Sequence, residues 1–159
     1  MIADTSSAAL AQTRSVIGLL RTGELAQPSM PGLVALDPLV QGVRDAGLPV
    51  ALTVEGAVRD IPAAVDLAAY RIVQEALTNA VRHAPGRAVE VVLRRENREL
   101  SIEIDDSASP GSSAPVQGDG GYGLVGLRER AYAVGGSFEA GPTPTGGFRV
   151  AAKLPVSAR

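Results

Sequence analysis

The longest regular pattern in the sequence is helical and lies between Pro62 and Pro85. Proline suits the first turn of a helix, and the Pro85-Gly86 pair ends one, so the pattern predicts a helix over residues 62–83. Its apolar residues recur three and four positions apart, which is the spacing of a single buried helix face. They are Val65, Ala68, Ala69, Ile72, Ala76 and Ala80.

Alternating apolar and polar positions predict strands around this helix. We expect them over residues 49–55, 88–95 and 100–104, from Phe138 onward, and across the apolar positions Phe148, Val150, Ala152 and Leu154. Asn97-Arg98 is a turn sequence, so the second and third strands should form a hairpin. Helical patterns also occupy residues 6–22, 38–46 and 124–134, and glycines follow each of them.

Helices and strands are intermixed, with at least two hairpin-like pairs. This order predicts an α+β two-layer sandwich, in which a mixed, mostly antiparallel sheet carries its helices on one face. Residues 24–37, rich in Pro, Gly and Ala, are expected to be a linker. Residues 107–122 are small and polar with no apolar period, so we expect a mobile loop there.

Composition narrows the class of protein. A length of 159 residues fits one domain, and 45% hydrophobic but only 3% aromatic residues predict an aliphatic core. A net charge of −2 with scattered basic residues argues against a nucleic-acid surface, and the lack of cysteine excludes disulfides and thiolate metal sites. No apolar run reaches the ~20 residues of a membrane helix and no signal-peptide pattern is present, so we expect a cytoplasmic protein.

The helix over residues 62–83 also carries a polar stripe. Glu75, Asn79 and His83 follow one another at intervals of four residues, with Arg71 one turn earlier and Arg82 beside them. Residues four apart share one side of a helix. The stripe is therefore either a solvated surface or a site for a charged ligand.

A glycine-rich segment, GGYGLVGL, occupies residues 120–127 before the next predicted helix. Glycine lets a ligand approach the backbone, and the unpaired amides of a helix start attract anions such as phosphate. The alternative is that these glycines simply end a loop.

The third candidate is the end of the strand over residues 100–104, where Asp105, Asp106 and Ser107 follow Ile104. A carboxylate at this position can accept a hydrogen bond from an amine of a ligand. Aspartate and serine are also common turn residues, which is the structural alternative.

The three motifs, in this order, resemble the catalytic ATP-binding domain of two-component sensor histidine kinases. That domain belongs to the superfamily of gyrase-, heat-shock-ninety-, histidine kinase- and mismatch-repair-type ATPases, whose ATP-binding fold is of the Bergerat type. The segment LVGLRERAYAVGGSFEAGPTPTGGFRVAAKLP (124–155) is similar to the subgroup that pairs with nitrate/nitrite-responsive-type regulators, as is the segment 47–56. The resemblance covers roughly residues 33–156.

The resemblance implies a Mg²⁺-ATP site. Asn79 would offer its amide oxygen to Mg²⁺, Glu75 would orient a metal-bound water or the reacting groups, and Arg82 would neutralise phosphate charge. His83 would contact the nucleotide or pack at the helix end. The loop 107–122 would form a lid. Gly121 and Gly123 would donate backbone amides to the phosphates, Leu124 would also belong to the nucleotide-binding segment, and Gly126 would permit close approach at the helix start.

One motif departs from the family pattern Asp-x-Gly-x-Gly, in which the aspartate accepts the adenine amino group. Strand alternation selects Asp106 for that role, whereas a simple alignment of the pair selects Asp105. In the first register the glycines become Ala108 and Pro110; in the second they become Ser107 and Ser109. Both glycines are lost either way, and the added side chains should weaken nucleotide binding.

The resemblance also implies a domain organisation. Residues 1–23 would be a remnant of the helical dimerisation domain, residues 24–37 a linker and residues 38–156 the catalytic domain. His83 lies in the asparagine-bearing helix, so the phosphoacceptor histidine must belong to a domain absent here, from which a response regulator would take the phosphoryl group. We expect this chain to be a monomer. The alternatives are a degenerate signalling domain with weak or no nucleotide binding and a serine kinase of the anti-sigma-factor type.

Overall fold

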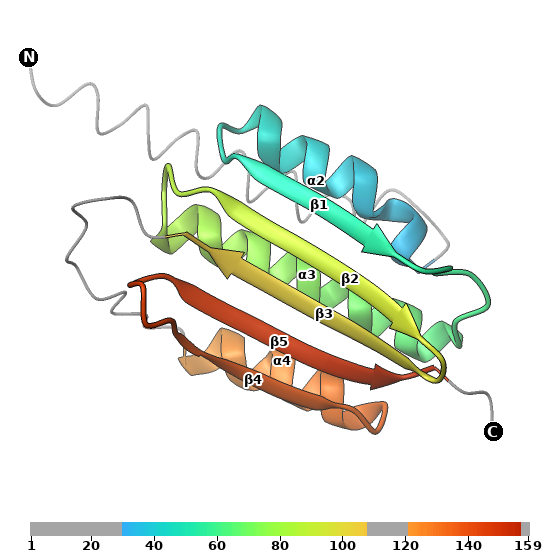
Figure 1. Ribbon diagram of the computed structural model, residues 1–159. Helices are drawn as coiled ribbons and strands as arrows, with labels where there is room; N and C mark the ends of the chain where they lie inside the picture. Colours follow the sequence, from blue (N-terminus) through green and yellow to red (C-terminus); the bar gives the residue numbers. More distant parts are fainter. Residues whose placement is uncertain (1–29, 108–120, 157–159) are drawn as a thin grey trace, which may run out of the picture.

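A computed structural model describes residues 30–107 and 121–156 of the chain as a sheet with helices packed against it (Figure 1). The helical segments are the 3-10 turn η1 (Leu33–Ala35), α2 (Leu36–Asp45), α3 (Ala63–His83) and α4 (Gly121–Ala133). The strands are β1 (Val50–Glu55), β2 (Val89–Glu96), β3 (Glu99–Asp106), β4 (Ser137–Pro142) and β5 (Phe148–Pro155).

The five strands form one sheet in the order β1-β2-β3-β5-β4. β1 and β2 are parallel, because α3 carries the chain back between them, and the other neighbouring pairs are antiparallel. The predicted mixed, mostly antiparallel sheet is therefore confirmed. The β2–β3 hairpin closes at Asn97-Arg98, where Asn97 has a positive φ of 50°.

The core lies between one face of the sheet and the helices. Alternate residues of β2 and β3 are buried there, including Val91, Leu93 and Ile102 at 0% exposure, and Ile72 and Leu77 of α3 are equally buried. In Figure 1, α3 runs behind β2 and β3, and α4 lies behind β4 and β5. The one-sided helical layer that the sequence predicts is thus present.

The opposite face of the sheet is polar and carries ion pairs between neighbouring strands. Arg94 contacts Glu55 at 2.7 Å, and Lys153 lies 3.9 Å from Glu99. The hydrogen bond to Glu55 and the charge of that carboxylate raise the pKa of Arg94 above its usual value. Such exposed pairs contribute little to stability, and their charged side chains make this face of the sheet hydrophilic.

Several element boundaries differ from those predicted. α2 begins at Leu36 rather than Pro38, and Leu33 and Leu36 are buried, so the end of the expected linker belongs to the folded domain. α4 begins at Gly121 instead of Leu124, which places Gly121 and Gly123 inside its first turn. The predicted helix over residues 6–22, the dimerisation remnant over 1–23 and most of the predicted lid lie outside the described residues.

The segment before α2 is held to the first turn of α3 by a hydrogen bond. The Asp66 Oδ1 atom, in the first turn of α3, accepts the backbone N–H of Leu33 at 2.9 Å. A Cβ on Gly32 would overlap the Asp66 carboxylate, so only glycine allows this approach. In the two described ranges, no helix is long and apolar enough to cross a membrane.

Candidate functional site

The polar stripe of α3 is present as predicted and lies beside its buried face. Glu75 and Asn79 are half-buried, one turn apart, whereas Arg82 and His83 at the end of the helix are exposed. The backbone between them is anchored by its apolar neighbours, since Leu77 and Ala80 are buried. The helix therefore presents an amide and a carboxylate at fixed positions.

The start of α4 lies directly against this stripe. A Cβ on Gly123 would be 3.5 Å from the Asn79 Nδ2 atom, 3.5 Å from the Glu75 Oε1 atom and 3.7 Å from the Asn79 Oδ1 atom. Two motifs separated by more than forty positions in the sequence are thus adjacent in space. Gly123 leaves its backbone accessible from the side of the two polar groups.

The first turn of a helix has N–H groups without intrahelical partners and the positive end of the helix dipole. In α4 that turn begins at Gly121 and includes Gly123 and Leu124, and Leu124 is half-buried against the core. Gly126 is one turn further along, and in the described structure a Cβ there would meet nothing within 4 Å. The start of α4, with its unpaired amides, therefore lies beside Glu75 and Asn79.

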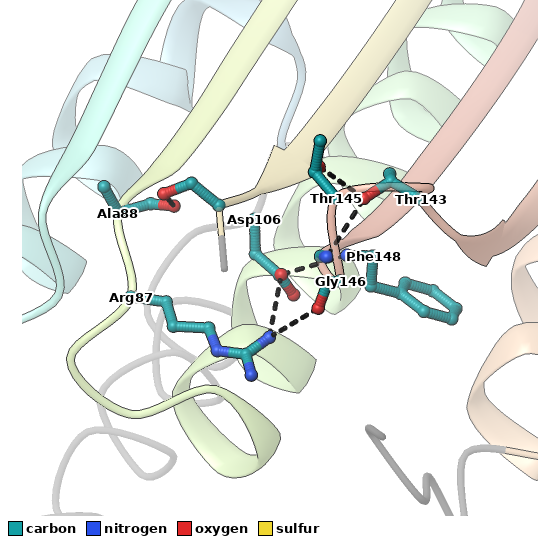
Figure 2. Close-up of polar contacts among 9 residues, drawn as sticks. Arg87, Ala88, Asp106, Thr143, Thr145, Gly146 and Phe148 are labelled. Carbon is teal, nitrogen blue, oxygen red and sulfur yellow. Dashed lines mark hydrogen bonds and ion pairs between the residues drawn. The ribbon is translucent and has the colours of Figure 1, made fainter. Parts of the chain in front are cut away.

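The end of β3 carries the second polar cluster. Alternation along β3 directs Asp106 to the same face as Ile102 and Ile104, and only 11% of its side chain is exposed. The Asp106 Oδ1 atom accepts the Phe148 backbone N–H at 3.0 Å and faces the Arg87 Nη1 atom at 3.4 Å. Figure 2 shows Arg87 and Asp106 pointing toward each other beside the β4–β5 turn.

Asp105 lies on the opposite, solvent-facing side of β3. Its Oδ1 atom accepts a hydrogen bond from the Arg149 Nε atom at 2.6 Å, across the β3–β5 pair. That hydrogen bond and the carboxylate charge raise the pKa of Arg149 above its usual value. The two candidate aspartates are therefore on different faces of the sheet, and Asp106 alone faces the helical layer.

Ser107 continues from Asp106 with both its backbone N–H and its hydroxyl donating to the Ala88 carbonyl, at 2.9 and 3.1 Å. A shallow hollow of about 930 Å³ opens at this end of the sheet. Asp105 and Arg149 line it from the solvent-facing side, and Asp106 lines it as well, so the hollow reaches both faces of the sheet at the end of β3. It is a different surface from the one that Asn79 and Gly123 share.

Sequence reasoning missed Arg87. It is 8% exposed and stands in the turn between α3 and β2, where its backbone N–H donates to the Ala84 carbonyl at 3.1 Å. An arginine in a Pro-Gly turn reads as a solvated residue, because its partner is nineteen positions away. The sequence did contain one signal. Strand alternation directs the Asp106 carboxylate inward, and a buried carboxylate needs a cationic or hydrogen-bonding partner.

Comparison with known proteins identifies the fold family. The family model for histidine kinase-, DNA gyrase B- and HSP90-like ATPases matches residues 64–158, more than half of the chain. The chain belongs to this family. The predicted ATP-binding domain of the histidine kinase type is confirmed, while the nitrate/nitrite-responsive subgroup stays a prediction.

Curated relatives of this histidine kinase-type ATPase domain are longer sensor proteins. The sensor histidine kinase YxjM of Bacillus subtilis is 34% identical over 149 residues, covering 92% of this chain and 35% of YxjM. The sensor protein VraS of Staphylococcus aureus is 32% identical over 97 residues, covering 61% of this chain and 28% of VraS. The chain thus spans about a third of the length of these relatives.

Solved structures agree on the fold. The blue-light activated histidine kinase of Erythrobacter litoralis EL346 aligns with a TM-score of 0.57 at 19% identity, over 92% of this chain and 54% of that one. The mycobacterial sensor histidine kinase MprB aligns with a TM-score of 0.55 at 19% identity, over 79% of this chain and 95% of that one. The α+β architecture is therefore shared with histidine kinase domains.

Proposed function

We propose that this chain is the ATP-binding catalytic module of a sensor histidine kinase. In the full protein it would donate the γ-phosphate of ATP to a histidine on a separate dimerisation domain, for onward transfer to a response regulator. The observation that carries the proposal is the approach of the α4 start, at Gly123, to Glu75 and Asn79 of α3 in a chain of this ATPase family.

The residues present suit Mg²⁺ held together with phosphates. Mg²⁺ is a hard cation that takes oxygen ligands and usually few protein groups. The Asn79 amide offers such an oxygen, and the Glu75 carboxylate one helical turn earlier could accept a hydrogen bond from a metal-bound water. In residues 30–107 and 121–156, no group of three or more His, Cys, Asp or Glu side chains could hold a metal. The ion would therefore take its remaining ligands from phosphate oxygens and water.

The phosphates would lie between the two helices. Backbone amides of Gly121, Gly123 and Leu124 would donate to phosphate oxygens at the positive end of α4. Arg82 and His83 stand exposed at the end of α3, where a cation can approach the triphosphate. Gly126, one turn further along α4, would permit close approach of the phosphates.

The base would be read by Asp106, which faces the helical layer, and not by Asp105, which pairs with Arg149 on the other face. One carboxylate oxygen of Asp106 would accept the adenine amino group. The lost glycines of this motif would leave the base less closely enclosed, so we expect weaker binding than a glycine-bearing site would give.

Catalysis in such a module is mainly positioning and charge neutralisation. Mg²⁺ bound with ATP would offset the charge on the transferring phosphoryl group. Glu75 would orient a metal-bound water or the reacting groups, and Asn79 would hold the Mg²⁺ through its amide oxygen. The partners would be the phosphoacceptor domain of the parent kinase and, indirectly, a regulator of the nitrate/nitrite-responsive type, with this domain in the cytoplasm.

Calorimetric titration of ATP and ADP, with and without Mg²⁺, tests the proposal. We expect saturable, Mg²⁺-dependent binding that Asn79→Ala and Asp106→Ala both weaken at least tenfold. Arg94→Ala, on the solvent-facing side of the sheet, is the matched control and should bind like the wild type. If the folded wild-type chain binds no nucleotide at millimolar concentration, the proposal is wrong.

One of the two alternatives has specific support. The engaged state of Asp106 and the lost glycines favour a degenerate signalling domain, which the absence of binding in that titration would establish. The shared fold also allows a serine kinase of the anti-sigma-factor type. Acid-stable phosphate on a protein substrate would indicate the serine kinase, whereas phosphohistidine is acid-labile.

A further inference from the structure

The two oxygens of the Asp106 carboxylate have different surroundings. Both neighbouring donors, the Phe148 N–H at 3.0 Å and the Arg87 Nη1 atom at 3.4 Å, converge on Oδ1. Among residues 30–107 and 121–156, both hydrogen bonds to the Asp106 side chain end on Oδ1, and none ends on the second oxygen, Oδ2. A carboxylate accepts through both oxygens, so this one has a single oxygen left for a ligand.

Arg87 holds this arrangement from the buried side. Its guanidinium also lies 3.5 Å from the Gly146 carbonyl, so one side chain joins the end of α3, the end of β3 and the β4–β5 turn (Figure 2). The turn is tightly seated, because a Cβ on Gly147 would overlap the Asp106 carbonyl oxygen. Rotation of the Asp106 carboxylate would break the contacts of Oδ1 with the Phe148 N–H and the Arg87 guanidinium.

The purine bases differ in the donors that they offer to a carboxylate. Guanine presents N1–H and N2–H side by side, a pair that matches two available carboxylate oxygens. Adenine presents its N6 amino group as the only donor on that edge, next to the acceptor N1. A carboxylate with one available oxygen satisfies adenine and leaves one guanine donor unpaired, and an unpaired buried donor is costly.

We propose that Arg87 is a positioning residue that sets the base preference of this site, adenine over guanine. It does so by holding Asp106 Oδ1 and turning the single oxygen Oδ2 to the base. The inference rests on the proposed function, in which Asp106 contacts the base. Arg87 itself acts through Asp106 and is not assigned a contact with the nucleotide.

The test compares ATP and GTP affinity, both with Mg²⁺, for the wild type, Arg87→Met and Arg87→Lys. Methionine keeps much of the buried volume without a donor, and lysine restores one. We expect Arg87→Met to reduce the ATP-to-GTP affinity ratio about tenfold and Arg87→Lys to recover part of it. Arg149→Met, which removes the partner of the neighbouring Asp105, is the matched control and should keep the wild-type ratio.

Asp106→Asn supplies a second test with an isosteric side chain. Because Arg87 and the Phe148 N–H both donate, they would hold the amide oxygen and turn the amide NH₂ to the base, where guanine O6 can accept. We therefore expect this variant to lose at least tenfold in ATP affinity and to reverse the ATP-to-GTP preference. This arm does not require any change at Arg87, so it decides the matter even if Arg87→Met fails to fold.

The outcomes separate the two proposals. If the wild type binds neither nucleotide, the proposed function fails. If the wild type binds ATP but folded Arg87→Met keeps its preference, or loses both nucleotides equally, Arg87 has only a structural role and this inference is overturned. An equal loss of ATP and GTP in Asp106→Asn overturns it as well.

Discussion

Gly123 in the first turn of α4 packs against the side-chain amide of Asn79 in α3, and a Cβ at position 123 would lie 3.5 Å from the Asn79 Nδ2 atom. That distance is an ordinary van der Waals contact, so the fold itself does not require glycine here. A ligand bound to the Asn79 amide and the Glu75 carboxylate would give a reason for glycine at this position.

Replacement of Gly123 by alanine separates these two requirements. We expect Gly123→Ala to keep or slightly raise stability, by up to about 1 kcal/mol, because alanine favours the helix more than glycine does. We expect it to weaken Mg²⁺-ATP binding about tenfold, since the methyl group would enter the site. Gly42→Ala in α2, where a Cβ meets nothing within 4 Å, is the control for the helical effect. Undiminished ATP binding by Gly123→Ala would contradict the assignment.

The two faces of α3 should respond differently to truncation. Leu77→Ala removes a side chain with 0% exposure, and we expect it to lower the free energy of unfolding by about 2–5 kcal/mol. Asn79→Ala, two residues away and half-buried, should change stability by less than about 1 kcal/mol while removing Mg²⁺-dependent binding. Urea denaturation and calorimetry on the same samples give both quantities, and a large stability loss in Asn79→Ala would count against a ligand-binding role.

The attachment of the chain to α3 through Asp66 and Leu33 is also testable. Asp66→Ala leaves the buried Leu33 N–H without its acceptor, so we expect a loss of about 1–3 kcal/mol in the free energy of unfolding. Asp66→Asn keeps an acceptor and should lose less. Asp45→Ala, which removes an exposed contact with Gln41, serves as the control and should be near neutral. Equal effects of Asp66→Ala and Asp45→Ala would show that the contact has no stabilising role.

The turn after α4 predicts a contrast between two glycines. A Cβ on Gly136 would overlap the Lys153 carbonyl oxygen and the Leu154 side chain, so we expect Gly136→Ala to cost about 1–3 kcal/mol through overpacking. Gly141→Ala in the edge strand β4 meets nothing within 4 Å and should be nearly neutral. Thermal unfolding monitored by circular dichroism compares them, and similar melting temperatures would refute the packing argument.

We also expect the 159-residue chain to sediment as a monomer at micromolar concentration. The one predicted helix before the domain, residues 6–22, is too short to bury the apolar area that a stable dimer needs. Analytical ultracentrifugation checks this expectation, and a tight dimer in this concentration range would refute it.

The sequence predicted the sheet well because its strands have one buried and one solvated face. Alternation along Leu100, Ile102 and Ile104 identifies β3 and extends to Asp106, which the structure directs to the same face. The same rule assigns Asp105 to the solvent-facing side, where it pairs with Arg149. Alternation identifies the face of each residue because successive side chains of a strand point to opposite faces of the sheet.

The misplaced boundaries have a common physical cause. Asp37-Pro38 is a favourable helix start and glycine is a poor helix former, so the sequence predicts that α2 begins at Pro38 and α4 after Gly123. Tertiary packing overrides these local preferences, because buried Leu33 and Leu36 dock the start of α2 onto the core. The Arg87–Asp106 ion pair could not be predicted from local sequence either, because the two residues are nineteen positions apart and meet only in the folded structure.

A single helix, α3, contributes one face to the core and another to the candidate site. Substitutions that remove the site can therefore leave the fold intact. Substitutions along Glu75, Asn79 and Arg82 leave the apolar side of α3 untouched. A homologue of this domain could therefore lose its ligand-binding side chains and still fold. Correct folding of a homologue is then no evidence that it transfers phosphate. The residues that replace Glu75, Asn79 and Arg82 in α3 are the informative ones.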